Sequence, residues 1–60
     1  MADLDPLSKL RHDLANPLSA LLAEAQLLLL TESQLDPVTV TGLREIESLA
    51  IRMRSILRAI

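Results

Sequence analysis

The stretch "LREIESLAIRMRSILRAI", residues 43–60, decides the expected fold because its apolar residues recur at alternating spacings of three and four. That spacing gathers them into one stripe along an α-helix, and most of the charged residues of the stretch lie off the stripe. The stretch therefore predicts an amphipathic helix that packs against a partner. The stripe consists of Leu43, Ile46, Ala50, Met53, Leu57 and Ile60.

A second leucine repeat in the N-terminal half predicts another packed helix. Pro17 interrupts it, and because proline lacks a backbone N–H and clashes with the preceding turn, we expect a bend there. The stripe consists of Leu7, Leu14, Leu21 and Leu28, with Leu10, Leu18 and Ala25 between them.

Two aspartate–proline pairs mark the expected helix starts. Asp5-Pro6 and Asp36-Pro37 each combine an N-cap acceptor with a proline suited to the first helical position. Thr39 and Thr41 are rival caps for the second helix. We predict helices at about 6–32 and 37–60, joined by a connection at about 33–36.

These elements predict an all-α domain over residues 1–60, an antiparallel two-helix hairpin. A 60-residue chain is marginal alone, and without cysteine it has no disulfides, so oligomerisation is the expected source of further stability. Two hairpins would close a four-helix bundle, so we expect a homodimer. Its expected core includes Leu14, Leu21, Leu28, Leu43, Ile46, Met53 and Leu57.

Composition argues against several other partners. The chain has no aromatic residue, a net charge of −2 and no basic run, so we expect no nucleic-acid binding. The apolar-rich stretch 18–30 is too short to span a bilayer, and no basic flanks favour a membrane surface, so we expect no direct membrane contact. We expect a cytoplasmic segment of a longer protein, whether or not that protein is membrane-anchored.

The polar cluster at residues 12–16 interrupts the first leucine pattern and holds the only histidine of the chain. Counted from Leu14 as the first heptad position, His12 falls at the position farthest from the core. Asn16 follows one turn later on the same outward face, and Asp13 lies beside the histidine. One histidine without a chelating partner predicts no metal site, and a two-helix chain offers no pocket for a hydrolase triad.

The string "HDLANPL", residues 12–18, resembles the H-box of sensor histidine kinases. The matching residues are His12, Asp13, Leu14, Asn16, Pro17 and Leu18. The whole chain is similar to the HisKA-type dimerisation and histidine-phosphotransfer domain of that family, a hairpin that dimerises into a four-helix bundle. Asp13 replaces the commoner glutamate, and Ala15 replaces the usual basic residue, which removes any phosphate contact from that position.

The resemblance implies a role for each polar residue of this box in two-component signalling. Nε2 of His12 is the phosphoacceptor, which takes the γ-phosphate of ATP and passes it to an aspartate of a response-regulator receiver domain. Asp13 is the general base that orients the imidazole tautomer. Asn16 positions water for phosphatase activity toward the regulator.

The resemblance also assigns the neighbouring residues of the first helix. Pro17 supplies a bend that lets the histidine move between donor and acceptor. Ser19 and Ala23 continue the outward face on which the response regulator docks. Lys9 and Arg11 are interpreted as solvated charges, with attraction of phosphate as the alternative.

The resemblance implies that the chain is part of a protein-histidine kinase, a transferase. The chain by itself is expected to be inactive. It has no glycine-rich nucleotide loop, so ATP and Mg are expected on a separate catalytic domain, and no cofactor is expected in this chain. The alternative function is a purely structural helical-hairpin dimerisation module, in which His12 has no chemistry.

Overall fold

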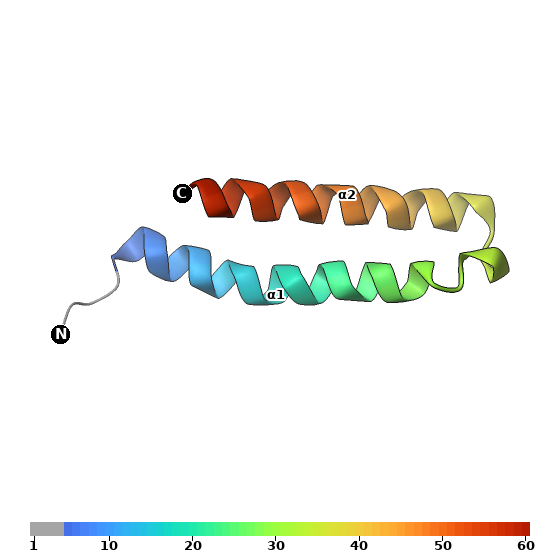
Figure 1. Cartoon of the computed structure of the whole chain (residues 1–60), viewed down its shortest axis with the longest axis horizontal. Coiled ribbons are helices and arrows are strands. Elements are labelled where there is room, and N and C mark those ends of the chain that lie inside the picture. The colour runs from blue at the N-terminus through green and yellow to red at the C-terminus, as the bar shows by residue number, and fades with distance from the viewer. Residues whose placement is uncertain (1–4) are drawn as a thin grey trace.

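The computed structural model describes residues 5–60 as two long helices packed side by side and antiparallel (Figure 1). Helix α1 spans Pro6–Leu29, a short 3-10 turn η1 spans Glu32–Gln34, and helix α2 spans Pro37–Ala59. The predicted all-helical hairpin is therefore confirmed. Within the described range, neither helix has the length and apolar character needed to cross a membrane.

Both helices begin at the predicted aspartate caps. Oδ1 of Asp5 accepts the backbone N–H of Ser8 at 2.7 Å, and Oδ1 of Asp36 accepts that of Thr39 at 2.6 Å. Each amide hydrogen bond lowers the pKa of its aspartate from the ordinary value, because it favours the ionised form. Asp36 is thus the cap of α2, rather than its rival Thr39.

Helix α1 ends at Leu29, short of the predicted residue 32, because the chain tightens there. The N–H of Leu30 bonds to the carbonyl of Leu27 at 3.2 Å, the three-residue step typical of a 3-10 turn. The guanidinium of Arg44 then holds both carboxylate oxygens of Glu32 at 2.7 Å. This contact ties the connection onto the first turns of α2.

The buried seam between the helices is small. Leu22 belongs to it although it lies outside the predicted stripe, whereas Leu14 and Leu21 of that stripe are 45% and 49% exposed. The hairpin therefore uses one edge of a wide apolar surface and leaves the other edge open. Among residues 5–60, the buried side chains are Leu18, Leu22, Ala25 and Ala50.

Polar contacts across the seam fix how the helices are aligned. Nε2 of Gln26 donates to Oε2 of Glu47 at 3.2 Å, and Nη1 of Arg11 donates to the carbonyl oxygen of Ile60 at 2.9 Å. Helix α1 continues through Pro17, and its first turns incline toward α2 (Figure 1). The N-terminal turns of α1 therefore lie beside the C-terminal turns of α2.

Candidate functional site

Two neighbouring grooves along residues 5–60 share Leu18 and Leu57 in their linings. The first, which we call the apolar groove, has a volume of about 320 Å³. Its lining contains no charged residue, and it joins side chains of both helices. The residues that line this groove alone are Leu14, Pro17, Leu21, Met53 and Ile56.

The second groove contains the histidine, and we call it the His12 groove. It has a volume of about 430 Å³ and opens on the other side of Leu18 and Leu57. Three arginines line it, one from α1 and two from α2, and no carboxylate does. The polar and charged residues of this groove are Ser8, Arg11, His12, Ser19, Arg54 and Arg58.

His12 is exposed, where its heptad position places it. Within residues 5–60, no hydrogen bond joins its imidazole to another side chain. Its two ring nitrogens are therefore open to an incoming group. The backbone of α1 holds the ring at the rim of the His12 groove, one turn after Ser8 and seven residues before Ser19.

Asp13 is also exposed, but it lies outside the His12 groove, because consecutive helical residues are about 100° apart. Its Oδ2 accepts a hydrogen bond from Nζ of Lys9 at 2.9 Å. That bond and the ammonium charge of Lys9 lower the pKa of Asp13 from its ordinary value. The same bond and the carboxylate charge of Asp13 raise the pKa of Lys9. The structure thus joins Asp13 to Lys9, and the predicted contact with His12 stays a prediction.

The other predicted site residues lie on three different surfaces of α1. Asn16 and Ala23 are exposed and line neither groove, whereas Ser19 is exposed and lines the His12 groove. Pro17 lines the apolar groove, away from the histidine. Of these four residues, the structure brings only Ser19 into one hollow with His12.

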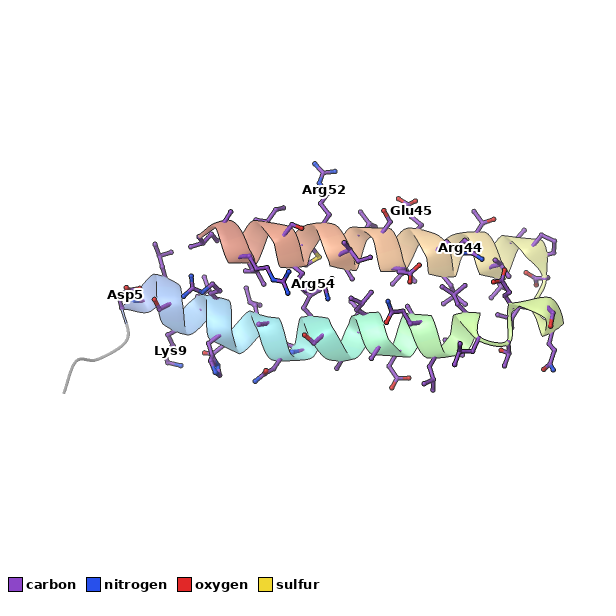
Figure 2. The ribbon with its side chains drawn as sticks, viewed as in Figure 1. Asp5, Lys9, Arg44, Glu45, Arg52 and Arg54 are labelled. Carbon is purple, nitrogen blue, oxygen red and sulfur yellow. The ribbon has the colours of Figure 1, made fainter. Side chains whose placement is uncertain are left out.

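Arg54 and Arg58 are the residues near His12 that sequence reasoning missed. Figure 2 shows Arg54 directed into the space between the helices, while Arg52 points away from α1. Arg54 is half-buried, and Arg58 lies one turn beyond it. The short connection between the helices could have predicted their position. It makes the hairpin antiparallel, so the C-terminal turns of α2 lie beside the N-terminal turns of α1.

The described residues offer no cluster of three or more His, Cys, Asp or Glu side chains that would hold a metal ion. The chain matches no protein-family model, no curated protein and no solved structure.

Proposed function

We propose that this chain is the phosphoacceptor and dimerisation domain of a two-component sensor histidine kinase. The observation that carries the proposal is the "HDLANPL" string, residues 12–18, on the first helix of a helical hairpin, where its polar residues His12, Asp13 and Asn16 are exposed. The combination matters because the string alone is short. Both its similarity to the H-box and its place in the hairpin support the same function.

The proposed chemistry starts from the accessible imidazole of His12. A neutral imidazole is a competent nucleophile near pH 7, and histidine can carry a covalent intermediate. Nε2 attacks the γ-phosphorus of ATP that a separate catalytic domain holds with Mg, and the bond from phosphorus to the ADP oxygen breaks. The phosphoryl group then passes to an aspartate of a receiver domain. The exposure of His12 supports this scheme, because two different proteins must reach one nitrogen in turn.

Asp13 is proposed as the general base that accepts the Nδ1–H of His12 and so leaves the lone pair on Nε2. In the structure its carboxylate is held by Lys9 instead. That ion pair is exposed on both sides, and exposed pairs contribute little to stability because water screens them. Release of the carboxylate from Lys9 toward His12 therefore costs little.

The apolar groove supports the proposed homodimer. It exposes side chains that water disfavours, such as Met53 at 51% and Ile56 at 54% exposure. Monomers rarely leave a long apolar surface uncovered. A second copy laid along this groove would complete a four-helix bundle and leave the His12 groove open to the catalytic and receiver domains, the latter over Ser19 and Ala23.

The apolar groove equally supports the second candidate, a structural dimerisation module in which His12 has no chemistry. The two functions differ in one measurable property. Only the first requires that His12 take up phosphate from a kinase catalytic domain, whereas both require a dimer.

The test is incubation of the chain with histidine-kinase catalytic domains and ATP labelled at the γ-phosphate. We expect label that is stable in base and labile in acid on the wild-type chain, and none on His12→Gln. Circular dichroism and sedimentation should show the same helicity and dimer for both, because His12 makes no packing contact that glutamine would lose. Label that persists on His12→Gln, or label that no catalytic domain can transfer, would leave the structural module as the function.

A further inference from the structure

The basic lining of the His12 groove stands out in a chain of net charge −2. The carboxylates near this end do not line the groove: Asp13 pairs with Lys9, and Glu47 accepts a hydrogen bond from Gln26. Asp5 caps the first turn of α1 at Ser8, outside the lining, and its charge acts on Arg11. The positive charge of the groove therefore has no neutralising carboxylate in its lining. Such a concentration of guanidinium groups attracts an anion.

The position of Arg54 is unusual for a helical hairpin. It belongs to the line of α2 residues that face α1, seven residues after Glu47 and three before Leu57, where an apolar side chain would stabilise the hairpin more. Among residues 5–60, neither Arg54 nor Arg58 forms a side-chain hydrogen bond or an ion pair. Packing within the hairpin does not account for either charge.

We propose that Arg54 and Arg58 form an anion-binding site that holds the phosphoryl group carried by Nε2 of His12. The inference deepens the proposed function and rests on it, since it takes His12 to be the phosphoacceptor. A guanidinium presents planar pairs of N–H donors that match phosphate oxygens, and its charge favours the dianion. Arg11 lines the same groove, but one of its donors is already bonded to the carbonyl oxygen of Ile60.

The site also compensates for a departure in the H-box. Ala15 stands where the similar kinases have a basic residue, so α1 offers no cation within the box. Helix α2 supplies two cations from across the groove instead. These arginines are positioning residues for the phosphorylated state, and we expect them to act on the phosphoryl group rather than on folding.

The experiment loads His12 without a kinase, using potassium phosphoramidate. Nε2 attacks phosphorus, the N–P bond of phosphoramidate breaks, and ammonia leaves with the bonding electron pair. Phosphorus NMR then follows the pKa of the phosphoryl group on the wild-type chain and on Arg54→Gln, Arg58→Gln and the double variant. Arg52→Gln is the matched control, because it removes the same charge two residues from Arg54 on a side chain that points away from α1.

We expect the double variant to raise the pKa of the phosphoryl group by about 0.5 to 1, because lost positive charge favours protonation. Its initial rate of phosphoryl uptake should fall roughly five- to tenfold, the scale of one charge-assisted hydrogen bond at an exposed site. Arg52→Gln should match wild type in both. A double variant that titrates and reacts like Arg52→Gln would overturn the arginine site.

Two single variants keep the test decisive. Arg58 is exposed, so Arg58→Gln reports on the site even where loss of half-buried Arg54 weakens the hairpin. Arg54→Lys keeps the charge and loses the planar fork, and should fall between wild type and Arg54→Gln. Phosphoramidate needs no kinase, so the anion site and the proposed function can fail separately. If the pKa of the phosphoryl group depends on the arginines but no kinase labels the chain, the proposed function is overturned and the anion site is retained.

Discussion

The two grooves of this hairpin differ in what each gains from a partner. The apolar groove is lined by side chains that are stabilised when another surface covers them, whereas the His12 groove is lined by cations that stay hydrated when open. Leu18 and Leu57 are the common wall between the two. The proposed dimer contact and the proposed chemistry at His12 therefore lie on separate sides of the hairpin. Substitutions on one side are expected to spare the other.

The largest expected effect comes from a charge placed in the apolar groove. Met53→Lys should weaken the dimer at least roughly 100-fold, because association would bury an unpaired ammonium. Ile51→Lys is the matched control: Ile51 is 40% exposed and Met53 51%, but Ile51 does not line that groove. Sedimentation should show a dimer for Ile51→Lys and a monomer or unfolded chain for Met53→Lys. Equal behaviour of the two variants would contradict dimerisation through this side.

The next effect concerns the chemistry at His12. Asp13→Asn should slow phosphoryl uptake from a kinase catalytic domain by about 10²- to 10⁴-fold, the usual contribution of a general base, without loss of helicity. Lys9→Gln is the control, because it frees the carboxylate and should leave uptake intact or faster. The measurement is the initial rate of labelling. An unchanged rate for Asp13→Asn would make Asp13 a surface acid paired with Lys9 and nothing more.

A smaller effect is expected for the hydrolysis of the phosphoryl-aspartate of the receiver domain. Asn16 faces outward one turn after His12, and its carboxamide has both donors and an acceptor with which to orient a water molecule. Asn16→Ala, in the chain joined to a catalytic domain, should lose about 10- to 100-fold in dephosphorylation of the receiver domain and keep autophosphorylation. Equal loss of both activities would indicate damaged helix geometry near Pro17 rather than a role for Asn16.

Local signals in the sequence predicted local structure well. The aspartate–proline pairs predicted both caps, and the apolar spacing predicted both helices. The periodicity did not predict which edge of α1 faces α2, since Leu21 and Leu22 are both apolar and only packing decides between them. The placement of Arg54 in one groove with His12 depends on the alignment of the two helices, which no local signal in the sequence specifies. The bond between Lys9 and Asp13 was predictable, because residues four apart on a helix are neighbours.

The N-cap of α2 lies in neither groove and therefore tests stability alone. Asp36→Ala should lower the thermal midpoint by roughly 4 to 8 °C at neutral pH. The amide of Thr39 lowers the pKa of Asp36 in the folded chain. The cap therefore stabilises the fold fully at pH values above the pKa that Asp36 has in the unfolded chain, and this stabilisation is lost as the pH falls through the lower pKa of the folded chain. Thermal melts should thus show that the difference in thermal midpoint between variant and wild type becomes smaller in acid. Phosphoryl uptake at neutral pH should be the same for both.

The smallest effect tests how far the proposed dimer surface extends along α2. Gly42 precedes Ile46 by one turn on the open apolar edge, and nothing in the hairpin lies within 4 Å of a Cβ added there. Gly42→Ala should therefore stabilise the chain by about 0.5 to 1 kcal/mol, since alanine loses less backbone freedom in a helix interior. Exposed Ser48→Ala is the control, with a gain of about half that size. Denaturant unfolding at two protein concentrations measures both. A gain that appears only at the lower concentration would show a second copy packed so close to Gly42 that the added methyl group collides with it.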